Sequence, residues 1–352
     1  MPWLRGPLPR RVLLVADPGD GHHVEICFLR FFARLRESLP FDWELRTYRD
    51  GTASVDATFD LVILCRPRFP EGLSVLDSAN ALGLSAMAMI DDNWPAAGRE
   101  YARYRDLFSP GRPALDAFLD CIRRADVTLV YNGTLARELE PIARRLELLP
   151  TNVDLSLFSA RTPIDREGGR LLVGYAGSPR FESSAFEALA ELVRRRPAVD
   201  LLLMGHELPS PLESVPSRRL QFVPFVRGYP EYASQLATLA PDVLVAPLED
   251  NVFSASKCPN KFLEITAVHA AGVYSRVEPY VSVVDDGRTG LLVANRTTDW
   301  LIALERLVDD STLRRAIAAK SMDRVSRDFS TSAVQPQFEA VLRRATQYRA
   351  RR

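Results

Sequence analysis

The sequence predicts an α/β protein built from two doubly wound domains. Short apolar runs, typical of buried parallel strands, alternate with helical patterns, and the whole alternation occurs twice. With 352 residues the chain is longer than one ordinary hydrophobic core holds. A polar stretch over 150–169, which ends in REGG, separates the two series. We therefore expect one domain on each side of it and a ligand-binding cleft between them, at the carboxyl ends of the strands.

The first series opens with an apolar run, a glycine-containing loop and a helical pattern. These are VLLVA (12–16), DPGDGH (17–22) and residues 24–35. Further strands are expected over 60–65, 86–90 and 127–131, with helices around 73–82 and 113–124. Strands of this kind, separated by helices, indicate a parallel sheet that is covered on both faces.

The second series has the same character and ends in a longer helical region. Strands are expected over 170–175, 200–204, 220–224, 242–246 and 290–293, and helices over 184–195, 229–239 and 260–271. Three helical stretches follow between 298 and 349, of which the last covers 332–348.

Composition excludes several classes of protein. Lys+Arg and Asp+Glu are equal at 45 each, so no global field attracts nucleic acid, and the apolar fraction of 47% is typical of a soluble globular protein. No apolar run reaches the roughly 20 residues of a spanning helix, no signal peptide precedes the first strand, and the four cysteines lack CxxC spacing. We expect a cytoplasmic protein. The basic C-terminal RRATQYRARR and the N-terminal arginines are either solvated tails or a loose contact with an anionic membrane surface.

Small residues close the first strand of the second domain, in VGYAGSPR. Gly177 and Ser178 let the backbone approach a phosphate, and Arg180 can donate to a phosphate oxygen. The alternative is an ordinary loop with a solvated arginine.

The helical pattern over 260–271 carries one glutamate among apolar residues. Glu264 can accept both hydroxyls of a ribose, while Lys257 and Lys261 can neutralise a diphosphate whose charge grows as the sugar bond breaks. The alternative is an exposed, salt-bridged helix end.

Paired carboxylates follow a strand of the first domain. Asp91 and Asp92 can accept hydrogen bonds from acceptor hydroxyls or assist their deprotonation, or they cap the next helix. No histidine or third carboxylate stands at ligand spacing, so we expect no metal. Of His22 and His23, one can reach the cleft. Arg66 and Arg68 either meet an anionic acceptor or are solvated.

Several motifs resemble family 4 glycosyltransferases of the GT-B fold. They are ELLPTNVDLSLF, VGYAGSPR, NKFLEITAVHAAGV and VVDDGRTGLLV, continued by the helices after 298, and MIDDNWPAAGREYARY is similar to a capsule- or O-antigen-type branch. The resemblance implies two Rossmann-like domains that face a central cleft. It divides the chain into an acceptor-side domain (1–150), a nucleotide-sugar-binding domain (151–330) and a final helix (331–352) that crosses back to the first domain.

The resemblance also implies roles for individual residues. Glu264 corresponds to the second glutamate of the E-x7-E motif, which holds the donor ribose. Gly177 and Ser178 belong to the phosphate-side loop, and Thr289 and Gly290 to the turn that supports the donor loop; Pro247, after strand 242–246, completes this nucleotide-binding set. The loop with Gly19, Asp20, Gly21 and His22 would face donor and acceptor.

Two departures from the family pattern concern the sugar and the diphosphate. Ser256 stands eight residues before Glu264, so the glutamate that normally contacts the sugar is absent. Ser178 and Ser183 replace the family's arginine and lysine after the glycine loop, and Arg180, Lys257 and Lys261 are expected to take over the diphosphate.

We therefore expect a hexosyltransferase-type enzyme of bacterial polysaccharide synthesis. It would move a sugar from a UDP-, GDP- or dTDP-linked donor to a saccharide or a lipid-linked saccharide with retention, without a permanently bound cofactor. Lys261, Lys257, Arg180, Asp91 and Asp92 are its predicted catalytic residues. A sugar-nucleotide epimerase of the GT-B fold and a non-catalytic partner subunit are the alternatives.

Overall fold

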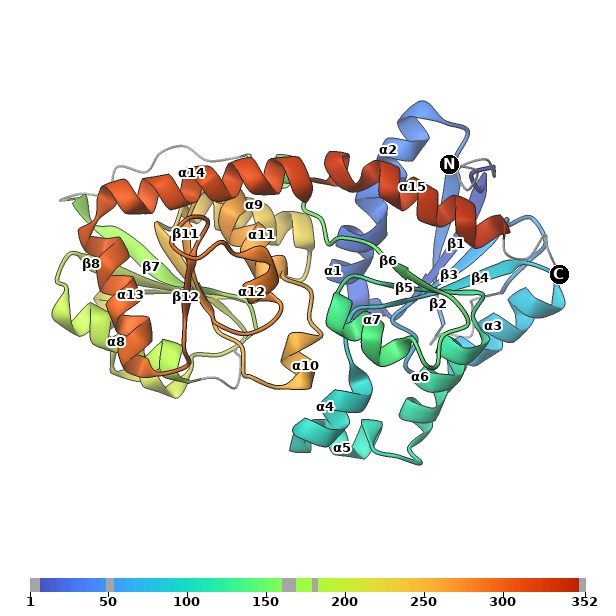
Figure 1. The fold of residues 1–352 in the computed structure, drawn as a ribbon, viewed down its shortest axis with the longest axis horizontal. Helices are drawn as coiled ribbons and strands as arrows, with labels where there is room; N and C mark the ends of the chain where they lie inside the picture. The colour runs from blue at the N-terminus through green and yellow to red at the C-terminus, as the bar shows by residue number, and fades with distance from the viewer. Residues whose placement is uncertain (1–6, 49–53, 160–168, 179–182, 348–352) are drawn as a thin grey trace. The chain divides into compact units, whose positions relative to one another are not determined.

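The protein is described by a computed structural model over residues 7–48, 54–159, 169–178 and 183–347. Its contacts divide the chain into two compact units. Unit 1 consists of Met1–Asn152, Asn251–Cys258 and Thr331–Arg352, and unit 2 of Val153–Asp250 and Pro259–Ser330. Each unit contains one six-stranded sheet (Figure 1).

The sheet of unit 1 has the strand order β2-β1-β3-β4-β5-β6, and each strand pairs with its neighbours in parallel. The strands are β1 (Arg11–Ala16), β2 (Asp42–Thr47), β3 (Leu61–Cys65), β4 (Ser85–Ile90), β5 (Val127–Val130) and β6 (Leu146–Leu148). β3 and β4 are buried along their whole length, as expected for central strands that are covered by helices on both faces.

Helices cover both faces of this sheet. The helices of unit 1 are α1 (Gly21–Val24), α2 (Arg30–Ser38), α3 (Pro70–Ala81), α4 (Trp94–Glu100), α5 (Ala102–Phe108), α6 (Pro113–Arg124), α7 (Gly133–Leu139), α10 (Val252–Ala255) and α15 (Thr331–Gln347). A π-helical turn over Glu25–Leu29 joins α1 to α2.

Two of these helices come from distant parts of the sequence. In α15, Phe338 is fully buried and stacks on Phe31 of α2 with ring centroids 4.2 Å apart. In α10, Phe253 is buried in a core that also contains Trp94 and Tyr101. The sequence-based division assigned Asn251–Cys258 to the second domain; burial of the Phe253 ring explains why this segment belongs to unit 1 instead.

Unit 2 has the strand order β12-β11-β10-β7-β8-β9, again with parallel pairing throughout. The strands are β7 (Leu171–Ala176), β8 (Val199–Gly205), β9 (Leu220–Pro224), β10 (Val243–Ala246), β11 (Ala271–Ser275) and β12 (Leu291–Val293). Its helices are α8 (Ser184–Arg195), α9 (Tyr229–Leu239), α11 (Asn260–Ala267), α12 (Tyr280–Val283), α13 (Thr297–Asp309) and α14 (Ser311–Asp328).

One predicted helix of unit 2 is shorter than expected. The pattern over 260–271 predicted a single helix, but α11 ends at Ala267 because His269 adopts a left-handed conformation with φ of 57°. Its side chain is exposed rather than packed, and the chain then enters the buried strand β11. β11 lies between β10 and β12, so the sheet has a strand there that the sequence pattern did not predict.

The predicted class, two doubly wound parallel sheets covered by helices, is confirmed by this topology. No helix in the described ranges is both long and apolar enough to span a bilayer.

Candidate functional site

The strand order of unit 2 marks a point where ligands bind in open α/β sheets. From β7 the chain adds β8 and β9 on one side, and β10, β11 and β12 on the other, so the direction reverses between β7 and β10. Ligands of such sheets occupy the carboxyl ends of the strands at this switch point. Gly177 directly follows β7 and Pro247 directly follows β10.

Helix α11 follows β10 and brings a charged cluster to this region. Glu264 is 5% exposed, and its Oε2 lies 2.5 Å from the Lys261 ammonium. The hydroxyl of Tyr232 on α9 donates to the same oxygen over 3.0 Å and accepts from Lys261 over 3.1 Å. The Glu264 carboxylate is therefore buried and oriented, which differs from the exposed helix end that was the alternative.

Tyr232 remains a hydrogen-bond donor in this cluster. Burial, followed by the negative charge of Glu264, raises the pKa of Tyr232 well above its usual value. The sequence analysis did not single out this tyrosine, because its place in YPEYASQL marks only the buried face of a helix.

Gly177 makes room for the lysine of this cluster. Its φ is +143°, and a Cβ at this position would lie 2.9 Å from Cε and 3.1 Å from Nζ of Lys261. Gly177 of the predicted phosphate-side loop and Lys261 of α11 are thus brought together. Ser178 is exposed, and its carbonyl accepts a hydrogen bond from Tyr175. Arg180 lies outside the described residues.

The DG-x-TG turn is held by its own side chains. The Asp285 amide donates to the Thr289 hydroxyl over 2.8 Å, and Thr289 is buried. At Gly290 a Cβ would lie 2.6 Å from the ring of Tyr274, so only glycine fits. The geometry shows how Thr289 and Gly290 shape the turn; their contact with a nucleotide stays a prediction.

The loop after β10 is held by hydrogen bonds to the amide and to the carbonyl of Leu248. The amide of Leu248 donates to Ser275 Oγ over 2.8 Å, and its carbonyl accepts from Asn295 over 2.7 Å. Pro247, which precedes Leu248, is buried. A nucleotide contact at Pro247 stays a prediction as well.

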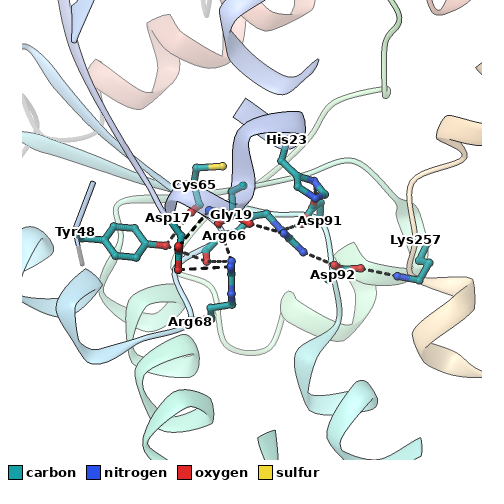
Figure 2. A network of polar contacts seen from close by, with 11 residues as sticks. Asp17, Gly19, His23, Tyr48, Cys65, Arg66, Arg68, Asp91, Asp92 and Lys257 are labelled. Carbon is teal, nitrogen blue, oxygen red and sulfur yellow. Dashed lines mark hydrogen bonds and ion pairs between the residues drawn. The ribbon is translucent and has the colours of Figure 1, made fainter. Parts of the chain in front are cut away.

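In unit 1 the switch point lies between β1 and β3, and a network of charges occupies it (Figure 2). Arg66 follows β3 and is 7% exposed. Its Nε donates to Asp91 over 2.6 Å, its Nη1 donates to Asp20 over 2.6 Å, and its Nη2 donates to Asp92. One guanidinium therefore holds three carboxylates together.

Each of these aspartates has a second partner (Figure 2). Arg68 donates to Asp20 over 2.8 Å, Lys257 donates to Asp92 over 2.8 Å, and Nδ1 of His23 lies 2.5 Å from Asp91 Oδ2. Arg66 is buried and Arg68 is half-buried, and both are held in ion pairs rather than solvated, which corrects one of the two interpretations offered for them. In the described part of the chain, no three His, Cys, Asp or Glu side chains are grouped to hold a metal ion.

The ion pairs outweigh burial in setting the charge of Asp91 and Asp92. Burial by itself raises the pKa of both carboxyls, but Arg66 and His23 hold the pKa of Asp91 far below its usual range. Lys257 and Arg66 likewise hold the pKa of Asp92 below its usual value, against the effect of burial. Both side chains are ionised at neutral pH and are weak bases.

Lys257 belongs to unit 1, apart from the cluster of Lys261. Its ammonium lies 3.9 Å from the centre of the Phe253 ring in addition to its ion pair with Asp92. Asn132 Nδ2 donates to the carbonyls of Ala255 and Lys257, over 3.1 and 3.0 Å, and so fixes the backbone. The two lysines, predicted to act together on a diphosphate, therefore have separate partners.

Ser256 is fully buried in the same segment. Its hydroxyl donates to the carbonyl of Val252 over 2.8 Å and accepts from Asn93 over 3.3 Å. The serine that replaces the family's sugar-contacting glutamate is thus a packing residue of unit 1.

The glycine-containing loop after β1 is an exposed turn with a buried carboxylate. Asp17 caps the short helix Pro18–Asp20, and Gly19 and Gly21 are exposed. Asp20 points to the arginines and is 1% exposed. His22 is half-buried at the start of α1, whereas the imidazole in the network belongs to His23.

The network could have been anticipated in part. Arg66 and Asp91 each directly follow a buried strand, and the ends of parallel strands meet at one edge of a sheet. The sequence does not say which charges pair, because the partners are 25 to 165 residues apart.

The two parallel sheets with their helices have the GT-B arrangement of glycosyltransferases. Along the sequence, residues 180–310 match the model of the family Glycosyl transferases group 1. The predicted resemblance to GT-B glycosyltransferases is therefore confirmed, and the group 1 match supports glycosyl transfer as the class of reaction; the finer assignment to family 4 stays a prediction. No curated protein matches the sequence.

Solved structures of the same fold match over nearly the whole chain. Sucrose-phosphate synthase from Thermosynechococcus elongatus has a TM-score of 0.74 at 16% identity, covering 95% of this chain and 98% of its own. Anabaena HepE, solved with UDP-glucose, has a TM-score of 0.70 at 12% identity over 94% and 99%. A candidate UDP-N-acetylglucosamine 2-epimerase from Listeria monocytogenes has a TM-score of 0.59 at 12% identity over 94% and 96%. At these identities the likeness shows the fold.

Proposed function

We propose that this chain transfers a sugar from a nucleotide diphosphate sugar to a hydroxyl of a saccharide or a lipid-linked saccharide. The observation that carries the proposal is the buried Glu264, oriented by Lys261 and Tyr232 beside Gly177 at the switch point of unit 2. A buried carboxylate at this position suits the two hydroxyls of a ribose. The group 1 family model, which covers residues 180–310, supports the same class of reaction.

In the proposed site Lys261 serves the diphosphate. Its ammonium lies next to the glycine that ends β7, where the backbone can come close to a phosphate. A fixed positive charge there stabilises the negative charge that develops on the departing diphosphate. Ser178, Pro247, Thr289 and Gly290 would line the nucleotide from the neighbouring loops, and Arg180 would add a second cation.

On unit 1 the carboxylates are proposed to orient the acceptor. Asp91 and Asp92 are ionised and held by cations, so they accept hydrogen bonds from sugar hydroxyls better than they remove protons. Lys257 holds Asp92 in place. The exposed Gly19 and Gly21 leave room for a substrate beside His22.

The finer features of the proposal concern the stereochemistry, the donor, the pathway and the location. Retention, a hexosyl donor and a role in bacterial polysaccharide synthesis follow the resemblance in the motifs of the second half. A UDP-linked donor is the first to test, since HepE was solved with UDP-glucose. The four cysteines are free thiols, which supports a reducing, cytoplasmic location. Loose membrane contact is proposed for the basic ends of the chain.

A calorimetric titration of UDP, GDP and dTDP tests the donor site. Glu264→Ala should weaken binding of the preferred nucleotide about tenfold to a hundredfold, because a hydrogen bond to a charged group contributes about 1.5–3 kcal/mol. Glu213→Ala, which removes an exposed carboxylate of unit 2, is the matched control and should bind as the wild type does. Equal affinity in Glu264→Ala and the wild type would show that the nucleotide binds elsewhere.

Two other functions have specific observations in their favour. The Listeria candidate epimerase has the same fold, so conversion of a sugar nucleotide to its epimer without an acceptor is a second possible activity. The buried Ser256, in place of a glutamate, favours a non-catalytic partner subunit. Incubation of nucleotide sugars without acceptor separates the three: an epimer identifies the first alternative, and slow donor hydrolysis above background excludes the second.

A further inference from the structure

The hydroxyl of Tyr232 bridges the two charged side chains of the unit 2 cluster. It donates to Glu264 Oε2 over 3.0 Å and accepts from Lys261 Nζ over 3.1 Å, and the ammonium lies 5.2 Å from the centre of the tyrosine ring. Tyr232 is buried, and burial raises the pKa of its hydroxyl well above the usual value, so it keeps the proton that it donates. Because a hydroxyl both donates and accepts, this one oxygen holds both partners.

The cavity beside this bridge has apolar walls and no room for a water molecule. Besides Tyr232, Lys261 and Glu264, it is lined by Ala176, Leu236, Leu244, Val245 and Ile265. Water cannot stand in for a missing partner there, because a buried water needs space and two to four polar groups around it. The three polar side chains therefore satisfy one another, and each restricts the position of the other two.

One oxygen of Glu264 is left for a ligand. An ionised carboxylate has about four acceptor sites, two on each oxygen. Tyr232 and Lys261 both donate to Oε2 and thus occupy the sites of that oxygen. Among the residues that the structure describes, no donor reaches Oε1. Its two acceptor sites match the two hydroxyls of a ribose.

One N–H of Lys261 is left in the same way. An ammonium has three protons to donate, and two hydrogen bonds lead from Nζ to Glu264 and Tyr232. In the described ranges of the chain, Lys261 has no further acceptor. A Cβ on Gly177 would lie 3.1 Å from Nζ, so the ammonium with its remaining N–H is beside the loop where the backbone can approach a phosphate.

We propose that Tyr232 is a positioning residue of the donor site, which couples recognition of the ribose to recognition of the diphosphate. This role rests on the proposed function. By holding Glu264 Oε2 and Lys261 Nζ on one hydroxyl, Tyr232 leaves Oε1 for the ribose hydroxyls and one N–H for a phosphate oxygen. The site then binds a nucleoside diphosphate as one unit, and neither a nucleoside nor an inorganic diphosphate alone satisfies it.

Tyr232→Phe tests this coupling, because it removes the hydroxyl and keeps the ring. The probes, titrated by calorimetry, are the tightest binder among UDP, GDP and dTDP and the analogue of that nucleotide without ribose hydroxyls. The variant should bind the nucleotide about tenfold more weakly, the effect of one hydrogen bond to a charged group. The analogue should lose about threefold or less, since only its contact with Lys261 is disturbed.

Two further variants sharpen the test. Thr238→Val removes an exposed hydroxyl of the same helix, which donates to the Ser234 carbonyl over 2.9 Å, and should bind both probes as the wild type does. In a Glu264→Ala background, Tyr232→Phe should weaken binding by less than about twofold more, because residues that act through a shared partner are not additive. Thermal unfolding measures any general loss of stability, which would lower both affinities and leave their ratio unchanged.

Three outcomes would overturn the role of Tyr232. They are wild-type affinity in Tyr232→Phe, an equal loss for the nucleotide and its analogue, and a full further loss in the Glu264→Ala background. A wild-type protein that binds none of the three nucleotides, or a Glu264→Ala variant that binds them unchanged, would refute the donor site itself. The two failures are distinguishable, because the role of Tyr232 fails alone when Glu264→Ala loses affinity and Tyr232→Phe does not.

Discussion

At the carboxyl edge of its sheet, unit 1 groups three aspartates, of which two are buried, with two arginines, a lysine and a histidine. At the corresponding edge of unit 2, Gly177 leaves room for a single lysine, Lys261, which is paired with Glu264. In both sheets the strand order reverses at the first strand, but the side chains that occupy the two switch points differ. In unit 1 the charges mainly satisfy one another.

The two clusters differ in how tightly their charged side chains are held. A network in which one buried arginine joins three carboxylates, each with a second partner, is rigid, since moving one group leaves another charge unpaired. The smaller cluster of unit 2 has fewer ion pairs, and it has a glycine where a Cβ would meet Lys261. Unit 1 thus has a fixed frame of charges, and unit 2 carries the smaller cluster that we propose binds the nucleotide. The predictions below probe this contrast.

The largest effect is expected when the centre of the unit 1 network is removed. Arg66→Met leaves Asp20, Asp91 and Asp92 without their shared cation, which should lower the free energy of unfolding by about 3–5 kcal/mol. Urea denaturation followed by circular dichroism measures it. The control, Arg123→Ala, removes an ion pair with Asp120 whose side chains are both about half exposed, and should cost less than about 1 kcal/mol. Similar losses in the two variants would refute the idea of a rigid frame.

Acid should weaken unit 1 through the same carboxylates. Because the pKa of Asp92 is lower in the folded state than the ordinary value of about 4, its stabilisation is present above that pH and is lost as the pH falls toward the folded-state pKa. Each unit of depression corresponds to about 1.4 kcal/mol. Urea unfolding between pH 7 and pH 3 should show a smaller loss for Asp92→Asn than for the wild type.

Asp106→Asn is the control for this acid effect. The Asp106 side chain is 95% exposed, so its loss should leave the pH dependence of stability unchanged. An Asp92→Asn protein with the same pH dependence as the wild type would contradict the role assigned to the Asp92 ion pairs.

The smallest effect on stability, but a distinct one on binding, is expected at Gly177. In Gly177→Ala the new Cβ meets Lys261 and the backbone keeps an unfavourable φ, at a cost of about 1–2 kcal/mol. Displacement of Lys261 should also weaken nucleotide binding, as calorimetry will measure. Gly83→Ala has a positive φ of 78° with no atom within 4 Å of the new Cβ, so it should lose stability without losing affinity. Unchanged affinity in Gly177→Ala would separate Lys261 from the ligand site.

Much of the fold follows from local patterns in the sequence. Helices α6, α8 and α9 begin and end where the apolar periodicity predicts, because amphipathic faces and prolines mark them. β2 was missed since this edge strand, DWELRT, is largely polar. β11 was not predicted and the helix before it was expected to run to 271, because the turn between them depends on the left-handed backbone of His269, which no apolar pattern encodes.

The candidate site was predicted less completely, for a physical reason. Glu264 and Gly177 carry signals of their own, a carboxylate on an apolar helix and a glycine after a strand. The pairings of Lys257 with Asp92 and of His23 with Asp91 depend on side-chain geometry between distant segments. Lys257 and Lys261 were predicted to act together because they are four residues apart. They belong to different units.

The interleaving of the two units has a consequence for how the chain folds as it is made. Most of unit 1 is translated first, but its core also contains Phe253 and Phe338. These residues belong to the segments that begin at Asn251 and Thr331. Synthesis at about 5–20 residues per second places on the order of ten seconds between Asn152 and Thr331. Throughout that time the nascent sheet of unit 1 exposes apolar surface at the ribosome, so the unit that is translated first completes its packing last.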